Sequence, residues 1–327
     1  MATPERFVSS GNLPGRARVQ QVVDDAHARF APEQGGSLSS VYPALARADP
    51  DAFGLAVVSA TGDRVVAGDA EAPFTIMSVA KPFVFALVGE KVGVEEVRRR
   101  VGVNATGMAF NAAYPVERDP RGRTNPMVNA GAIATTGLWP GGDLEDRWSR
   151  LHEGLSRFAG HALPMDEATL ESARATNHRN RALANLMTSL GTLVGEPAEA
   201  VELYTRQSCL AVTAVDLAVM GATLADAGTN PLTHESVIDP ETAHAVLAVM
   251  LIAGMYETSG DWLFDVGMPG KSGIGGGMLT VSPGKGALGT FSPLLDAAGN
   301  SVRGELAARY LTRSLGLDLL ASEVAVP

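Results

Sequence analysis

Ser78-Val79-Ala80-Lys81 is the stretch on which the fold prediction depends, together with Lys271-Ser272-Gly273 near the other end of the chain. In a helix, side chains three residues apart lie on one face, one turn apart. The Lys81 amine can therefore accept the proton of the Ser78 hydroxyl when the serine attacks a carbonyl carbon. The pattern predicts Ser78 as a nucleophile and Lys81 as its base, with Lys271 in a supporting role.

Lysine is scarce in this chain, since only four of its 26 basic residues are lysines, at positions 81, 91, 271 and 285. Two of these four lie in the two motifs. Arginine stays protonated at any working pH, so a position that needs a titratable amine has to keep lysine. The bias favours a chemical role for Lys81 and Lys271.

The Ser-x-x-Lys pattern also occurs a second time, as Ser282-Pro283-Gly284-Lys285. There, Pro-Gly predicts a turn in which the serine and lysine side chains do not converge. For the first copy, the alternative is a serine that caps a helix and a lysine in solvent.

The glycine run from Gly273 to Gly277 follows the second motif. A phosphate-binding loop is excluded by spacing, because its first glycine would fall at Asp265. The glycines suit a strand edge that a ligand approaches closely, and a plain hairpin turn is the alternative. A Lys-Ser-Gly strand paired with a Ser-x-x-Lys helix is the pattern of penicillin-recognising serine enzymes.

Composition narrows the class of protein. Hydrophobic residues make up 46% and charged residues 19% of the 327 residues, which is typical of a globular chain. A net charge of −10 argues against nucleic acid or an anionic membrane as the main partner. The N-terminus has no basic stretch followed by an apolar run, so we expect no signal peptide and a cytoplasmic protein.

Cofactor chemistry finds no support in the sequence. The single cysteine, Cys209, excludes an internal disulfide and a cysteine-based zinc cluster, and no two histidines have metal-ligand spacing. We therefore expect no metal and no cofactor. A Ser-His-Asp triad stays open, although no Gly-x-Ser-x-Gly turn surrounds a serine.

Strand patterns lie near both ends of the chain and helical patterns lie between them. We expect an α+β fold in which one antiparallel sheet, built from both chain ends, carries an inserted helical lobe. The expected helices are 18–30, 78–91, 242–256 and 304–315, and the expected strands are 53–60, 64–67, 270–281 and 287–291. The expected domains are an N-terminal helical segment 1–40 and one catalytic domain 41–327, with a sheet lobe at about 50–75 and 235–327 and a helical lobe at about 76–234.

Longer motifs carry a family resemblance from about Val41 to Gly304. They are Phe74-Thr-Ile-Met-Ser-Val-Ala-Lys81, Asn125-Pro-Met-Val-Asn-Ala-Gly-Ala-Ile133, Arg179-Asn180, Asp216-Leu-Ala-Val-Met-Gly-Ala-Thr-Leu-Ala225, Gly228-Thr-Asn-Pro-Leu-Thr233, Gly254-Met-Tyr256, Lys271-Ser-Gly-Ile-Gly-Gly-Gly277 and Gly299-Asn-Ser-Val-Arg-Gly304. With them the chain resembles the serine-dependent glutaminases, which hydrolyse L-glutamine to L-glutamate and ammonia. The resemblance implies a β-lactamase/transpeptidase-like fold.

The resemblance also implies roles for further residues. Tyr204 and Tyr256 would line the site and pass a proton to the departing ammonia. Asn129 and Asn180 would hold the backbone end of the substrate. The backbone N–H groups of Ile274 and Ser78 would form the oxyanion hole. A small-molecule substrate and a homodimer or homotetramer are expected, with no nucleic acid and no membrane.

Three positions depart from the family pattern. Val41-Tyr42-Pro43 replaces Tyr-Ile-Pro, so the site tyrosine is missing or shifted by one, and Met77 replaces a glutamine. Ala173 replaces a glutamate that would pair with the α-ammonium group of the substrate. Leaving that ammonium without its partner would cost roughly 2–4 kcal/mol, or about 30- to 1,000-fold.

These departures leave two alternatives beside glutamine hydrolysis. A serine hydrolase of the same fold could act on another amide or ester that lacks a free α-amino group. A non-catalytic homologue could bind an amino-acid-like ligand, but the retained Ser78, Lys81 and Lys271 argue against it.

Overall fold

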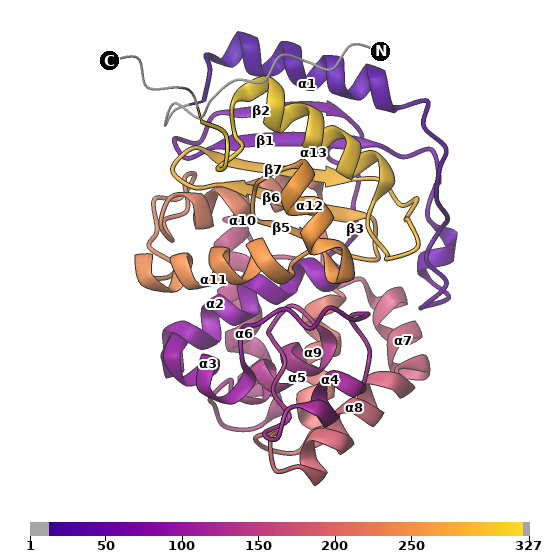
Figure 1. The fold of residues 1–327 in the computed structure, drawn as a ribbon, viewed down its shortest axis with the longest axis vertical. Helices are drawn as coiled ribbons and strands as arrows, with labels where there is room; N and C mark the ends of the chain where they lie inside the picture. Colours follow the sequence, from indigo (N-terminus) through magenta and orange to yellow (C-terminus); the bar gives the residue numbers. More distant parts are fainter. Residues whose placement is uncertain (1–12, 323–327) are drawn as a thin grey trace.

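The computed structural model of the chain describes residues 13–322, and its centre is a five-stranded antiparallel sheet (Figure 1). The strands lie in the order β2-β1-β7-β6-β5. Their bounds are β1 Gly54–Ser59, β2 Arg64–Gly68, β5 Gly270–Ser272, β6 Gly277–Ser282 and β7 Gly286–Phe291. Strand β1 pairs with β7, so segments from both ends of the chain meet in one sheet. The expected α+β class is confirmed.

Helices cover both faces of this sheet, and the strands other than the edge strand β2 are buried on both sides as a result. Along β1, Leu55 and Val57 pack against helices α1 (Arg16–Phe30) and α13 (Val302–Leu315), whereas Ala56 and Val58 face the opposite core. Alternate residues of a strand point to opposite faces, so a strand covered on both sides reads as a continuous apolar run.

Helix α10 (Ala214–Ala225) packs on the second face of the sheet at very short range. A Cβ atom on Gly289 of β7 would lie 2.1 Å from the carbonyl oxygen of Ala214, and one on Gly221 would lie 2.4 Å from the Leu279 side chain. Side chains larger than hydrogen do not fit between helix and sheet at these two positions.

A second layer of helices lies in the lower half of Figure 1 and consists of α2 Ala80–Val92, α3 Val94–Val101, α4 Tyr114–Arg118, α5 Asn129–Gly137, α6 Leu144–Ala159, α7 Glu167–Thr176, α8 His178–Ser189 and α9 Pro197–Ser208. Of the remaining helices, α12 Ser259–Asp265 lies higher, at the level of the sheet, and α11 Pro240–Ala253 lies between it and that layer. A short ladder of β3 (Phe74–Thr75) and β4 (Ala211–Val212) joins the segment before Ser78 to this layer.

Two expected elements differ in the structure. The strand expected over 270–281 is two strands, because a tight turn after Ser272 reverses the chain and pairs β5 with β6. The helix expected to reach Tyr256 ends at Ala253, since Tyr256 has a φ of 57°, which no α-helix accommodates. The hairpin expected after Phe53 is confirmed as β1–β2.

Two sequence-based expectations stay predictions. The absence of a signal peptide concerns residues 1–12, which lie outside the described range. The division into a segment 1–40 and a domain 41–327, with its two lobes, is also a prediction. Within residues 13–322, no helix combines the length and apolar character needed to cross a bilayer.

Candidate active site

Ser78 lies in a short 3₁₀ turn, Met77–Val79, that leads directly into helix α2. The turn is anchored from behind, because the Ile76 N–H donates to the Leu210 carbonyl oxygen at 2.9 Å. Met77 has a φ of 47°, in the left-handed region that residues with a side chain rarely occupy. Such strain is typical of positions where the fold must aim one side chain, here that of Ser78.

Lys81 follows Ser78 by one turn, and its side chain is 2% exposed. Its amine donates a hydrogen bond to Oδ1 of Asn129 at 2.7 Å. Burial lowers the pKa of Lys81 to about 7, because a charged amine loses its hydration in the interior. Near neutral pH, part of the protein therefore carries an uncharged amine on the residue one helical turn after Ser78.

Asn129 connects Lys81 to two other residues that the sequence predicted for the site. Tyr204 donates to the same Oδ1 atom at 3.1 Å, and Asn129 Nδ2 donates to Oδ1 of Asn180 at 2.9 Å. Burial raises the pKa of Tyr204, so its hydroxyl keeps its proton. Asn129 can hold this position because it begins α5, where its own N–H donates to the Phe110 carbonyl oxygen.

Lys271 and Tyr256 form the other wall. The Lys271 amine, fully buried on β5, lies 4.1 Å from the centre of the Tyr256 ring and donates to the Ser272 carbonyl oxygen at 2.5 Å. Burial, and then the charge of Lys81, hold the pKa of Lys271 well below its ordinary value. Charging both buried amines at once would be costly, so at least one of them stays neutral.

The Tyr256 side chain also contacts that of Ser78. Its hydroxyl donates to the Ser272 carbonyl oxygen at 2.8 Å. Burial raises the pKa of Tyr256, and a hydrogen bond with the Ser78 side chain acts in the opposite direction. A protonated phenol in contact with the serine can hand on a proton but cannot serve as the base.

The glycine run packs against the chain that carries Ser78. A Cβ atom on Gly273 would lie 2.9 Å from the Ile76 carbonyl oxygen and 3.3 Å from the Ser78 nitrogen, and one on Gly275 would lie 2.2 Å from the Thr75 carbonyl oxygen. The neighbouring backbone lies against these glycines, where a ligand was expected to approach. The run forms a hairpin turn and also borders the site, so both sequence-based interpretations apply.

A small pocket opens onto Ser78, with about 30 Å³ of space. The sequence-predicted residues that line it are Ser78, Asn129, Tyr204 and Ile274. Its other lining residues are Val41, Tyr42, Met77, Phe110, Ala173, Thr205, Ser208 and Cys209. The remaining predicted residues do not line the pocket, but they contact its lining residues or one another through the interactions described above. They are Lys81, Asn180, Tyr256 and Lys271.

Two of the lining residues were missed or left open by sequence reasoning. Tyr42 lines the pocket beside Val41, so the tyrosine expected near position 41 is present one residue later. The ring of Phe110 packs at a tilt against that of Tyr256, with ring centres 4.8 Å apart. Phe110 lies in the irregular segment between α3 and α4, and no local pattern distinguishes it from other surface aromatics.

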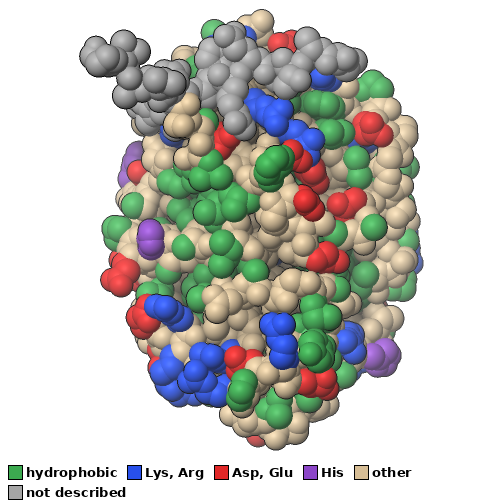
Figure 2. All heavy atoms as spheres, in the orientation of Figure 1, with side chains coloured by type: hydrophobic (Ala, Val, Ile, Leu, Met, Phe, Trp, Pro, Cys, Tyr) green, Lys and Arg blue, Asp and Glu red, His purple; other side chains and the backbone are tan. Residues whose placement is uncertain are grey.

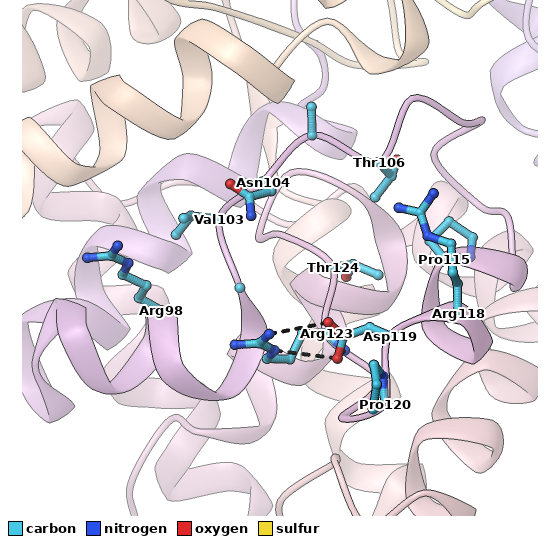
Figure 3. A pocket seen from close by; sticks show the side chains of 12 residues that line it. Arg98, Val103, Asn104, Thr106, Pro115, Arg118, Asp119, Pro120, Arg123 and Thr124 are labelled. Carbon is cyan, nitrogen blue, oxygen red and sulfur yellow. Dashed lines mark hydrogen bonds and ion pairs between the residues drawn. The ribbon is translucent and has the colours of Figure 1, made fainter.

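A larger cavity of about 410 Å³ lies elsewhere, between α3, α4 and their connection (Figure 3). Arg98, Arg118 and Arg123 face it, and Arg123 pairs with Asp119 at 3.3 Å. None of the predicted site residues lines this cavity, so size alone does not locate the chemistry.

The basic side chains at the lower left of Figure 2 lie over α3, where arginines pair with Glu95 and Glu96.

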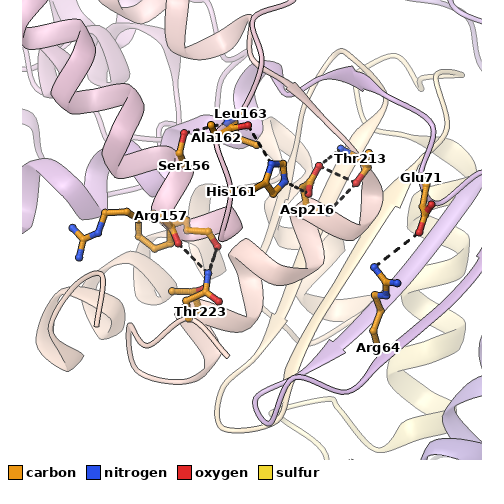
Figure 4. A network of polar contacts seen from close by, with 12 residues as sticks. Arg64, Glu71, Ser156, Arg157, His161, Ala162, Leu163, Thr213, Asp216 and Thr223 are labelled. Carbon is orange, nitrogen blue, oxygen red and sulfur yellow. Dashed lines mark hydrogen bonds and ion pairs between the residues drawn. The ribbon is translucent and has the colours of Figure 1, made fainter. Parts of the chain in front are cut away.

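The Ser-His-Asp alternative has one candidate, the pair His161 and Asp216, 2.7 Å apart (Figure 4). Asp216 also caps helix α10 through Thr213, and the second ring nitrogen of His161 contacts the Ala162 carbonyl oxygen at 3.2 Å. The nearby hydroxyl of Ser156 accepts from the Leu163 N–H. Both imidazole nitrogens are engaged, so this pair stabilises a helix terminus and activates no serine.

Within residues 13–322, no group of three or more side chains could hold a metal ion. The chemistry that the site offers is that of its own groups: a hydroxyl, two buried amines, two phenols and amide donors. This set can attack a carbonyl carbon, store an acyl group on an oxygen and move protons.

Known proteins resemble this chain over most of its length. The family model described as Glutaminase matches residues 36–320. Glutaminase 2 of Yersinia pestis is 56% identical over 97% of this chain and 93% of its own, and a glutaminase of Colwellia psychrerythraea is 42% identical over 94% and 98%.

Solved structures extend the likeness to the fold. The probable glutaminase ybaS superimposes with a TM-score of 0.93 at 38% identity, covering 94% of this chain and 100% of that one. Mglu in its glutamate form gives a TM-score of 0.89 at 39% identity, over 94% of this chain and 71% of that one. The fold expected from the sequence resemblance is confirmed.

Proposed function

This chain belongs to the glutaminase family, and from that premise we propose that it hydrolyses L-glutamine to L-glutamate and ammonia through an ester formed on Ser78. The observation that carries the mechanism is the buried amine of Lys81, one turn after Ser78, with a pKa lowered to about 7. A neutral amine donates one N–H to Asn129 and keeps its lone pair for the serine proton.

The first half of the reaction forms the ester. Oγ of Ser78 bonds to the carboxamide carbon while its proton passes to Nζ of Lys81. The carbonyl oxygen becomes an oxyanion, which the N–H groups of Ser78 and Ile274 stabilise; one such donor is worth about 10²- to 10³-fold in kcat. The carbon–nitrogen bond then breaks, and the nitrogen leaves as ammonia after taking a proton from Lys81 through Tyr256 or Tyr204.

The second half hydrolyses the ester. A water molecule gives a proton to Lys81 and attacks the acyl carbon, and Ser78 recovers its proton as glutamate leaves. Asn129 and Asn180 fix the amine of Lys81 and face the backbone end of the substrate. Lys271 adds a second neutral amine to the site, because burial and then the charge of Lys81 hold its pKa well below the ordinary value.

Ser78→Ala tests the assignment of the nucleophile. We expect ammonia release from L-glutamine to fall by more than about 10³-fold, and labelling by an electrophilic glutamine analogue, followed by mass, to disappear. Ser282→Ala is the matched control, since it alters the second Ser-x-x-Lys copy, where Lys285 instead donates to the Gly316 carbonyl oxygen. Unchanged turnover in Ser78→Ala would refute the mechanism. Stoichiometric labelling of the wild type at Ser78 would exclude a non-catalytic homologue.

The pH dependence of kcat/KM follows from the pKa of Lys81. The protonated amine cannot accept a proton, so activity is lost as the pH falls through the pKa of about 7 and is retained above it. We expect kcat/KM to drop about tenfold for each pH unit below that point. A steady-state profile from pH 5 to 9 measures this, and a flat profile between pH 5.5 and 7 would contradict the role of Lys81 as base.

The assembly and location of the protein remain proposals as well. We propose a homodimer or homotetramer that acts in the cytoplasm on a small-molecule substrate, in keeping with its acidic net charge of −10 and single buried cysteine. Light scattering coupled to size exclusion measures the mass of the assembly, and a monomer at micromolar concentration would contradict it.

A further inference from the structure

The pocket wall opposite Ser78 is apolar. Ala173, 1% exposed on α7, belongs to a small cluster with Met77, Leu170 and Cys209, and Tyr42 and Ile274 pack against that cluster. Ala173, Met77, Cys209, Tyr42 and Ile274 all line the pocket. The end of the site that must hold the rest of the substrate therefore presents methyl, thioether and ring surfaces.

Among the described residues, no carboxylate lines this pocket. The two carboxylates that most affect the wall are Asp166 and Glu202, which raise the pKa of Cys209 from behind it. Both already have partners. Asp166 accepts hydrogen bonds from two threonine hydroxyls, and Glu202 lies in ion pairs with Arg174 and Arg206. Neither is free to receive a cation in the pocket.

Two further carboxylates, Glu257 and Asp296, act on the pKa of Tyr256, and neither of them lines the pocket. Burial raises the pKa of Tyr42 and of Cys209 to about 12 each, so both stay neutral at physiological pH. The amine of Lys81, which donates to the pocket residue Asn129, is either neutral or positively charged and so supplies no negative charge. An ammonium group bound here would lose its hydration without gaining a counter-charge.

We propose that this pocket also accepts ω-amides of dicarboxylic acids that lack an α-ammonium group, with glutarate monoamide as the representative, and hydrolyses them at least as efficiently as L-glutamine. The inference rests on the proposed chemistry at Ser78. Oγ of Ser78 bonds to the amide carbon, the carbon–nitrogen bond breaks with release of ammonia, and water releases glutarate.

The test compares kcat/KM for glutarate monoamide and L-glutamine in the wild type, Ala173→Glu and Ala173→Gln. In the wild type we expect a ratio of one or more in favour of the monoamide. Ala173→Glu places a carboxylate in the wall and should shift the ratio toward L-glutamine by about 30- to 1,000-fold, the range for pairing a buried ammonium. Ala173→Gln has nearly the same size without the charge, so its shift should stay below about fivefold.

Two outcomes would overturn the inference. One is a wild-type kcat/KM that favours L-glutamine over the monoamide by more than tenfold, which is measured without any variant. The other is an equal shift in Ala173→Gln and Ala173→Glu, which would mean that volume decides. A wild type that hydrolyses L-glutamine but not the monoamide sinks this inference alone, whereas full turnover in Ser78→Ala sinks the proposed mechanism with it.

Discussion

Lys81→Arg is expected to lower kcat/KM for L-glutamine by about 10³- to 10⁴-fold, the upper range for removing a general base. The guanidinium group stays protonated at every working pH, so it cannot accept the Ser78 proton. The buried amine it replaces owes its base function to a pKa lowered to about 7. Ammonia release under pseudo-first-order conditions measures the loss.

Two further variants separate chemistry from folding. Lys91→Arg makes the same exchange at an exposed position in the last turn of α2, and kcat/KM should stay within about twofold. Lys81→Met keeps the length of the side chain without any charge, so it avoids a permanently charged group in the interior. If Lys81→Met folds to the same circular dichroism spectrum and still turns over at the wild-type rate, Lys81 is not the base.

Gly254→Ala is expected to destabilise the protein by about 3 kcal/mol or more, the cost of overpacking a tight contact. A Cβ atom there would lie 1.8 Å from the Gly270 carbonyl oxygen and 2.7 Å from the Met250 carbonyl oxygen. These are backbone atoms, so the end of α11 would have to move away from β5. Because β5 carries Lys271, activity should fall as well.

A matched control exists for this substitution. Gly260 begins the next helix, and a Cβ atom on it would meet nothing within 4 Å. Gly260→Ala should therefore leave stability unchanged or raise it by about 0.5–1 kcal/mol, through the helix propensity of alanine. Urea midpoints at constant slope measure both variants. Equal midpoints for Gly254→Ala and wild type would contradict the close packing of α11 on β5.

Sequence reasoning succeeded where the deciding pattern is short and local. Ser78 and Lys81 are one turn apart because helix geometry puts them there. The β1–β2 hairpin follows from its turn residues, and the contact between segments near the two chain ends follows from their strand patterns. The pairing of the Lys271 strand with the Ser78 helix came from the motif pair of penicillin-recognising serine enzymes, which records a long-range contact that neither motif contains alone.

What the sequence could not provide depends on packing between distant segments. The continuous apolar pattern over 270–281 conceals a turn whose glycines are needed to fit the backbone near Ser78. Phe110 reaches Tyr256 from an irregular connection, where neither period nor propensity predicts direction. The wall around Ala173 joins three separated segments, so its apolar character appears only once they are assembled.

The scarcity of lysine has a practical consequence for immobilisation. Lys81 and Lys271 are sealed in the site, Lys285 is 4% exposed and bonded to the Gly316 carbonyl oxygen, and Lys91 alone among the lysines is exposed. A support or dye that couples to lysine side chains should therefore attach at one side chain, that of Lys91 in the last turn of α2.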